Sequence, residues 1–211
     1  MSTYAELKAD IASWINRKDL TDTIPQFIKQ AEHKMYRGFV ASTGSSIALR
    51  CRDNLKKASL TPVDGAIALP SDFRELKEVT INGEGKTPIS SQFYNRLKNY
   101  TGKTQVFSLR DKDWYQYPLN DTSDTFDIIY YADYSGTLVN DADTNPILTA
   151  LPEIYLWGGL AMAELYIKND ARLTWSREFE SSIRSANTDA RRAEFSGASM
   201  AQRTQYTEVR R

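Results

Sequence analysis

The sequence is poor in the residues from which many active sites are built. It contains one cysteine and one histidine among 211 residues, and its 27 basic residues are balanced by 27 acidic ones. A single cysteine excludes an internal disulfide and fits a reducing compartment. A net charge of zero argues against a protein that coats nucleic acid by electrostatics alone, since that needs a basic surface.

Long apolar runs are also missing. A membrane-spanning helix needs about 20 consecutive apolar residues, and the most apolar stretch, 152–167, is shorter and is interrupted by Gly158, Gly159 and Glu164. The N-terminal residues, MSTYAELKADIASW, are amphipathic rather than continuously apolar, which is not typical of a secretory signal. We therefore expect a soluble protein, made in a cytoplasm and without a membrane partner.

Two short stretches imitate the end of a phosphate-binding loop, Gly85-Lys86-Thr87 and Gly102-Lys103-Thr104. A true loop has another glycine five positions before the second one, but Thr80 and Leu97 stand there. Neither stretch runs into a strong helix that could present its amides to a phosphate. We interpret both as tips of hairpins.

The stretch Asp141 to Asn145 resembles the opening of a calcium loop. Such a loop has glycine at its sixth position and glutamate at its twelfth, where this sequence has Pro146 and Pro152. A solvated linker is the preferred interpretation, and no metal site is predicted.

No other pattern predicts catalysis. His33 lies mid-helix between charged neighbours and is predicted to be a surface residue, while Cys51 belongs to a different predicted element. Nothing therefore positions a Cys–His pair. No pair of acidic residues has a spacing or an apolar setting that indicates a raised pKa. We predict that the protein is not an enzyme and binds no cofactor.

Two helices are predicted near the N-terminus. Thr3 and Glu6 fit a capping box, and the apolar residues that follow at helical spacing predict a helix over 3–17. Pro25 opens a second helix that runs to about Tyr36, with Gly38 near its end. We expect the two to form a hairpin that packs on the C-terminal helices.

Two further helices are predicted between residues 145 and 193, and the chain is built around them. Pro152 fits the first helical position, and the apolar residues after it occupy most faces, as in a buried helix. Gly158 and Gly159 each lower the helix propensity by about 1 kcal/mol relative to alanine. We therefore expect a neighbouring backbone to approach them closely.

The second C-terminal helix is long and amphipathic. Asp170 is its predicted N-cap. Its apolar residues recur at spacings of three and four; they are Leu173, Trp175, Phe179, Ile183, Ala186, Ala190 and Ala193. The small residues toward its end would let another helix pack closely.

The segment between the two helical pairs lacks, over most of its length, the helical spacing of apolar residues. Short runs separated by turn residues predict strands at 66–70, 75–81, 105–110, 113–118 and 125–134. Phe93, Tyr94, Leu97 and Tyr100 recur at helical spacing and predict one short helix, capped by Ser90 or Ser91. Residues 135–146 are predicted to be a linker.

The last sixteen residues contain few large apolar groups and cannot bury enough surface to fold alone. They are either a frayed end or an arm that becomes ordered on a partner. We therefore predict an α+β fold in three parts. A helical body comprises 1–40 and 147–195, a mostly antiparallel β-rich insertion with one short helix comprises 41–146, and a flexible tail comprises 196–211.

This order of elements resembles that of the head-to-tail connector, or adaptor, proteins of tailed bacteriophages, especially the short-tailed type. Three stretches carry the resemblance, the helices at 3–17 and 24–37, the turn and strand at 65–83, and the proline-led helix with the long helix after it at 145–183. In the second stretch, Leu69-Pro70-Ser71-Asp72-Phe73 is similar to a recurring L-P-x-D-F element of that family. The stretch 38–57 matches least.

The resemblance implies a structural protein of the virion neck, made in the host cytoplasm. Members form a homo-oligomeric ring of about twelve copies beneath the portal protein. They extend the DNA channel and dock tail or nozzle proteins, and DNA passes through without being tightly bound. Their C-terminal segment reaches the portal, which here implies portal-binding residues in the tail: Met200, Arg203, Tyr206, Val209, Arg210 and Arg211. Candidates for the contact between subunits are Arg177, Arg184, Arg191 and Arg192.

Two other functions stay open at this point. A DNA-binding packaging or regulatory module would use the basic residues of the last helix and tail, which are Arg184, Arg191, Arg192 and Arg203. An enzyme would use carboxylates of the insertion; the candidates are Asp111, Asp113, Asp127 and Asp133. Salt-dependent DNA binding would favour the first, and a pocket holding two carboxylates, one of them protonated, would favour the second.

Overall fold

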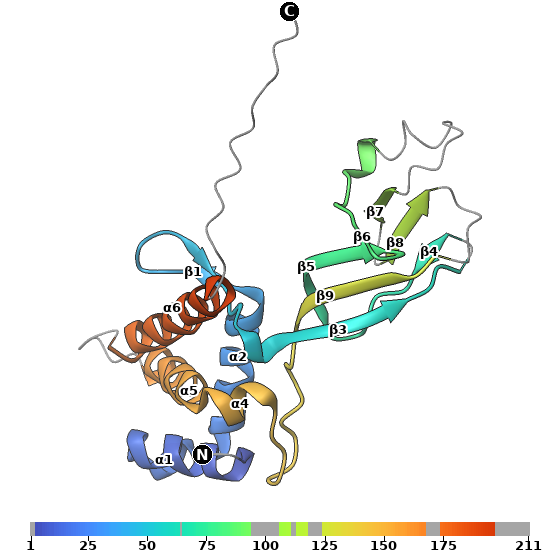
Figure 1. Cartoon of the computed structure of the whole chain (residues 1–211). Coiled ribbons are helices and arrows are strands. Elements are labelled where there is room, and N and C mark those ends of the chain that lie inside the picture. Colours follow the sequence, from blue (N-terminus) through green and yellow to red (C-terminus); the bar gives the residue numbers. More distant parts are fainter. Residues whose placement is uncertain are drawn as a thin grey trace, which may run out of the picture.

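The protein has two lobes, a helical body and a β unit that projects from it (Figure 1). This computed structural model describes residues 3–63, 65–93, 106–110, 113–117, 124–167 and 174–196. The predicted α+β class is confirmed, with helices from both ends of the chain side by side and the strands between them in sequence.

The helical body begins with α1 (Tyr4–Ile15), a 3-10 turn (Lys18–Thr23) and α2 (Ile24–Arg37). The predicted cap of α1 is present, because Thr3 Oγ1 accepts a hydrogen bond from the Glu6 amide. Gly38 ends α2 with a φ of 89°, a conformation that favours glycine. A two-stranded hairpin follows, with β1 (Phe39–Val40) antiparallel to β2 (Ser46–Ile47).

The C-terminal part of the body contains α4 (Pro146–Ala150), α5 (Pro152–Ile167) and α6 (Thr174–Phe195). Pro152 begins α5 as predicted. The short helix α4 was not predicted; Asn145 caps it by accepting the Leu148 amide, so the expected linker ends in a helical turn. The predicted N-cap Asp170 lies outside the described residues.

The buried helix α5 lies against α1, α2 and α6. A Cβ atom added to Gly158 would lie 2.9 Å from Ala31 Cβ and 3.0 Å from the Phe179 ring. One added to Gly159 would lie 2.5 Å from Ile11 Cδ1. The expected close approach is therefore real, but side chains of three helices make it rather than a neighbouring backbone.

The β unit contains two antiparallel sheets. The first has the order β3 (Leu55–Leu60), β9 (Phe126–Ala132), β5 (Phe73–Ile81) and β6 (Glu84–Gly85). The second has the order β4 (Ala66–Ile67), β8 (Asp113–Tyr117) and β7 (Val106–Arg110). Aromatic rings connect the two sheets through edge-on contacts, with ring centroids 5.8 Å apart for Phe107 and Phe126 and 5.4 Å apart for Trp114 and Phe73.

Strand β3 was missed, because two of its six residues are consecutive lysines and its apolar residues alternate only weakly. It is an edge strand, where charged side chains oppose unwanted pairing. The predicted short helix begins as expected, since residues 91–93 are helical and Ser90 Oγ accepts the Phe93 amide. The continuation through Tyr94, Leu97 and Tyr100 lies outside the described residues.

Candidate interaction surfaces

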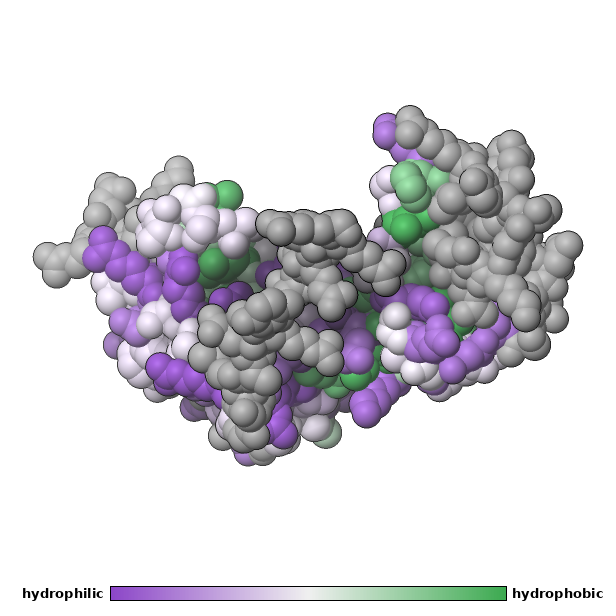
Figure 2. All heavy atoms as spheres, turned by 45° about the horizontal axis from the view of Figure 1, so that its top comes forward, coloured by the Kyte–Doolittle hydropathy of each residue, from purple (hydrophilic) through white to green (hydrophobic). Residues whose placement is uncertain are grey.

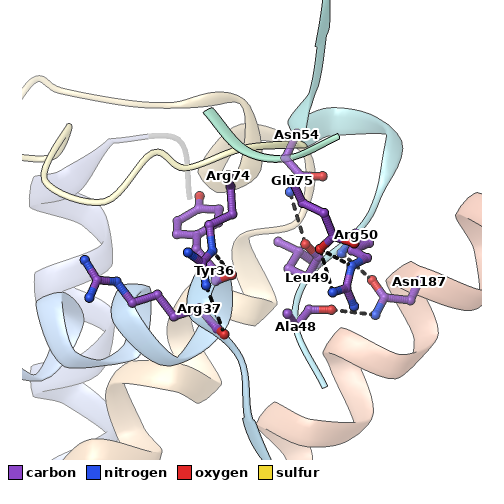
Figure 3. A network of polar contacts seen from close by, with 9 residues as sticks. All are labelled: Tyr36, Arg37, Ala48, Leu49, Arg50, Asn54, Arg74, Glu75 and Asn187. Carbon is purple, nitrogen blue, oxygen red and sulfur yellow. Dashed lines mark hydrogen bonds and ion pairs between the residues drawn. The ribbon is translucent and has the colours of Figure 1, made fainter. Parts of the chain in front are cut away.

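The two lobes are held together at a joint where the segment after β2 passes between α6 and β5 (Figure 3). The Asn187 side chain on α6 binds the backbone of this segment twice. Its Nδ2 donates to Ala48 O at 2.8 Å, and its Oδ1 accepts the Arg50 amide at 2.7 Å. The Asn187 side chain therefore fixes α6 to the segment after β2, which we call the connecting segment, through the two backbone groups on either side of Leu49.

Strand β5 is tied to the same joint. Glu75 on β5 forms an ion pair with Arg50 at 2.6 Å, and Lys77 forms one with Glu194 on α6 at 3.2 Å. Arg74 donates to the carbonyl oxygens of Tyr36 and Arg37 at the end of α2, which no later turn of the helix could satisfy. The ion pairs are partly exposed and contribute little each, so hydrogen bonds to backbone groups dominate the joint.

A cavity of about 330 Å³ opens beside this joint, and we call it the joint pocket. Its walls come from the C-terminal half of α6, the segment after β2, and strands β3, β5 and β9. The lining residues are Arg50, Cys51, Arg52, Leu55, Lys77, Tyr131, Asn187, Ala190, Arg191, Ala193 and Glu194. Ala190 and Ala193 thus face this pocket, and not another helix as predicted.

The hollow between the lobes is visible from the side shown in Figure 2, with the helical body on the left and the β unit on the right. Hydrophobic and hydrophilic residues both lie within it. Interfaces with other proteins commonly combine apolar and polar residues in this way, so a protein is a suitable partner for the hollow.

A second cavity of about 330 Å³ lies on the helical body between the β1–β2 hairpin, α5 and α6, and we call it the apolar groove. Phe39 and Phe179 stack at its base with ring centroids 5.5 Å apart. Val40 and Leu165 line it and are 72% and 51% exposed. Exposed apolar side chains around a groove are typical of a surface that another protein covers.

The four arginines predicted to contact a neighbouring subunit lie in different surroundings. Arg177 is exposed at the edge of the apolar groove, and Arg191 is exposed at the joint pocket. Arg184 is engaged within the chain, with Glu180 at 3.0 Å and with Thr43 and Ser45. Arg192 lies 3.6 Å from Asp189 on the surface. The structure does not gather them into one basic patch.

A polar cluster is buried between α2 and α5. Glu32 is 3% exposed and accepts hydrogen bonds from the Tyr155 hydroxyl at 3.2 Å and the Gly136 amide at 3.0 Å. Asn145 Nδ2 donates to Tyr155 Oη at 2.7 Å. Burial raises the pKa of Glu32, which sequence reasoning did not foresee. Glu32 lines neither the joint pocket nor the apolar groove, so we interpret the cluster as structural.

The residues that imitate catalytic or metal sites have local partners. Asp141 pairs with Lys8 at 2.6 Å, and the Asp143 carboxylate accepts the amides of Val139 and Asn140. The stretch Gly85-Lys86-Thr87 is not the tip of a hairpin as predicted, because the β5–β6 turn lies at residues 82–83 and Gly85 ends strand β6; Lys86 follows it and pairs with Glu84 at 2.8 Å. Within the described part of the chain, no group of three metal-ligating side chains comes together.

The lone cysteine and histidine lie in ordinary surroundings. Cys51 is buried, and burial raises the pKa of its thiol, so it is a poor nucleophile. His33 is half-buried on α2 rather than fully at the surface. Of the candidate carboxylates, Asp127 accepts a hydrogen bond from Ser59 and Asp133 accepts the Ser135 amide, while Asp111 and the Gly102–Thr104 stretch lie outside the described residues.

A family model described as SU10 adaptor protein matches residues 2–204. The chain belongs to the SU10 adaptor family. The resemblance to phage head-to-tail adaptors is therefore confirmed, and with it the role of a phage adaptor, a structural protein of the virion neck. No curated protein matches the chain.

The L-P-x-D-F element of this SU10 adaptor has a structural role. Asp72 accepts hydrogen bonds from Lys56 on β3 and from the Tyr130 hydroxyl on β9 at 2.9 Å. Phe73 packs edge-on against Trp114 of the second sheet. The element therefore connects β3, β9 and β8 at the base of the β unit.

The predicted portal-binding residues of the SU10 adaptor lie outside the described residues; they are Met200, Arg203, Tyr206, Val209, Arg210 and Arg211. The joint was missed at the sequence level, because Asn187 and Arg74 are single polar residues whose partners are 137 residues and 38 residues away. Among the helices that the structure describes, none is long and apolar enough to cross a membrane.

Proposed function

We propose that this SU10 adaptor is a head-to-tail adaptor that forms a ring of about twelve copies beneath the portal protein. In this proposal the ring extends the DNA channel and docks tail or nozzle proteins, and residues 197–211 anchor each subunit to the portal. The observation that carries the proposal is the family match over residues 2–204.

The geometry supports a ring subunit. A ring closes through two different surfaces of each subunit, which contact each other head to tail. In this proposal the apolar groove of the helical body and the projecting β unit are the two surfaces, and the joint between the lobes sets their relative position. The role lies in these surfaces, and we propose no catalytic step.

The rival DNA-binding function has less support. Two of the helix arginines, Arg184 and Arg192, have acidic partners in the chain, and the whole chain has no net charge. Binding to phosphates depends on free cationic side chains. We therefore propose that DNA passes the ring without being held.

The portal protein of the same virus provides the test. It is mixed with the full-length chain, with a version ending at Ser196, and with a full-length version whose residues 197–211 are scrambled as the control for length and composition. Complexes are examined by electron microscopy and sedimentation. We expect a ring on the portal only with the natural sequence.

If the version ending at Ser196 binds as well as the full chain, the tail is not the anchor and the body or the β unit makes the contact. If no version forms a complex with the portal, the proposed position beneath the portal is wrong.

A further inference from the structure

The joint pocket retains positive charge after its internal ion pairs are formed. Four cationic side chains line it. Glu75 neutralises Arg50, and Glu194 neutralises Lys77. Arg52 and Arg191 are exposed and form no ion pair within the described residues. Two guanidinium groups without an ion pair in the described part of the chain therefore line one cavity, that of Arg52 from the segment after β2 and that of Arg191 from α6.

The floor of the same pocket is apolar. Leu55, Tyr131 and Ala190 line it and are partly buried, and Cys51 in the lining is buried, whereas Arg52 and Arg191 are exposed. A ligand that fills the cavity must therefore carry acidic groups for the rim and an apolar group for the floor. Arginine is well suited to this role because its planar group binds carboxylates with two parallel hydrogen bonds.

We propose that the joint pocket binds an acidic segment of another protein of the virion, with an apolar side chain seated between carboxylates. This inference rests on the proposed adaptor function, because that function makes the partner another protein of the virion. It assigns the adaptor a docking site that is separate from its tail.

Charge complementarity excludes the other protein occupants. The chain's own residues 197–211 contain three arginines and one glutamate, so they match the pocket poorly. A second copy of the chain offers no accessible segment of this kind, because its stretch with a large apolar residue directly between two acidic ones is Glu178-Phe179-Glu180, and Phe179 and Glu180 are buried in the helical body. An acidic segment must therefore come from a different protein.

DNA is also a poor match. Phosphates are bound by open cationic surfaces, whereas this cavity is concave, has an apolar floor and holds Glu194 in its wall. The apolar residues of the cavity have no counterpart on a sugar-phosphate chain, whereas they can contact the apolar side chain of a peptide whose carboxylates reach Arg52 and Arg191.

The test uses a fluorescein-labelled nonapeptide with glutamates on both sides of a central leucine, and a matched peptide with glutamine in place of every glutamate. Binding to the full-length chain is followed by fluorescence anisotropy. We expect the glutamate peptide to bind about tenfold more tightly than the glutamine peptide, since each lost ion pair at a partly desolvated site weakens binding. The preference falls as salt is raised.

Substitutions locate the site. The double variant Arg52→Gln/Arg191→Gln should lose the preference of about tenfold for the glutamate peptide, and the charge reversal Arg52→Glu/Arg191→Glu should turn it into a preference for the glutamine peptide. The matched control Arg177→Glu/Arg192→Glu makes the same charge change outside the pocket and should bind like the natural chain. Circular dichroism confirms that each variant is folded.

The inference is wrong if the natural chain does not distinguish the two peptides, or if the pocket variants bind as tightly as the control. It is also wrong if duplex DNA binds more tightly than the glutamate peptide and loses affinity with the same two substitutions, because the pocket would then be a phosphate site. An adventitious salt-dependent attraction would affect the control variant equally, and that result also contradicts it.

The portal assay separates this inference from the proposed function. If the chain forms the portal complex but does not distinguish the glutamate peptide from the glutamine peptide, only the proposed ligand of the joint pocket is wrong. If the chain binds the glutamate peptide through Arg52 and Arg191 but forms no complex with the portal, the proposed position beneath the portal is wrong and the proposed peptide site is still supported.

Discussion

Two glycines in the middle of α5 show how single residues set the packing of the helical body. Gly158 lies against Ala31 of α2 and Phe179 of α6, and Gly159 lies against Ile11 of α1. The absence of two Cβ atoms lets three helices approach α5. This close packing offsets the cost of glycine inside a helix.

The substitution Gly158→Ala should destabilise the protein by about 1–3 kcal/mol, because the new methyl group meets Ala31 Cβ and the Phe179 ring. Gly159→Ala should cost less, since the clashing Ile11 Cδ1 is the end of a flexible side chain. Urea unfolding of both variants measures the difference. In a double-mutant cycle with Ala31→Gly, the loss in the double variant should be smaller than the sum of the two single losses, and additive losses would contradict the packing argument.

Glu32 makes stability depend on pH. Burial is the main cause of its raised pKa, and the nearby Asp133 adds to it, while the Gly136 amide, the Tyr155 hydroxyl and Lys29 act in the opposite direction. A carboxyl whose pKa is raised on folding favours the folded state most below its unfolded pKa. That contribution is lost as the pH rises through the folded pKa.

We therefore expect the unfolding free energy of the natural chain, minus that of Glu32→Gln, to fall as the pH rises above the ordinary glutamate pKa of 4.5. Taking the difference removes the contributions of the other titrating groups. Urea unfolding of both proteins between acidic and neutral pH measures it. A difference that is constant, or that grows with pH, would show that Glu32 is not destabilised in its charged form.

The joint is the place where elements of the helical body contact the β unit, and it sets how the two lobes are arranged. Helix α6 reaches the connecting segment through Asn187 and reaches β5 through Glu194. Strand β5 in turn reaches the end of α2 through Arg74. Elements from both ends of the chain and from the β unit thus meet at one place, which explains how the β unit projects in a defined direction.

Asn187→Ala should lower the unfolding free energy by about 1–3 kcal/mol, because the Arg50 amide and the Ala48 carbonyl both lose their partner. Hydrogen exchange at the Arg50 amide should become faster. Thr188→Ala is the matched control, since that exposed side chain bonds only within α6, to Arg184 O. Unchanged exchange at Arg50 in the Asn187 variant would mean that the bond does not fix the joint.

At the scale of the whole molecule, a ring that surrounds a DNA channel must bind DNA weakly enough to let it pass. The chain has no net charge, and its helix arginines are dispersed and partly paired. We expect the full-length chain to bind duplex DNA more weakly than micromolar at physiological salt, with affinity falling further as salt rises. Fluorescence anisotropy with a labelled duplex measures this, and a sub-micromolar affinity would favour the DNA-binding alternative.

The sequence by itself determined the features that depend on neighbouring residues. Thr3, Pro25, Gly38 and Pro152 mark helix boundaries through local backbone chemistry, so those boundaries could be predicted. The same is true of the α+β class, since apolar residues recur with helical spacing at both ends and alternate in the middle. The order of these elements was sufficient to indicate the adaptor family.

Only the tertiary structure decided where distant residues meet. Strand β3 was missed because its pairing with β9, and not its own residues, makes it a strand. The burial of Glu32, the two bonds of Asn187 and the meeting of Arg52 and Arg191 at one pocket likewise depend on residues far apart in the chain. Hydrogen bonds, desolvation and charge pairing act over a few ångströms in space, and a sequence read in order does not contain those distances.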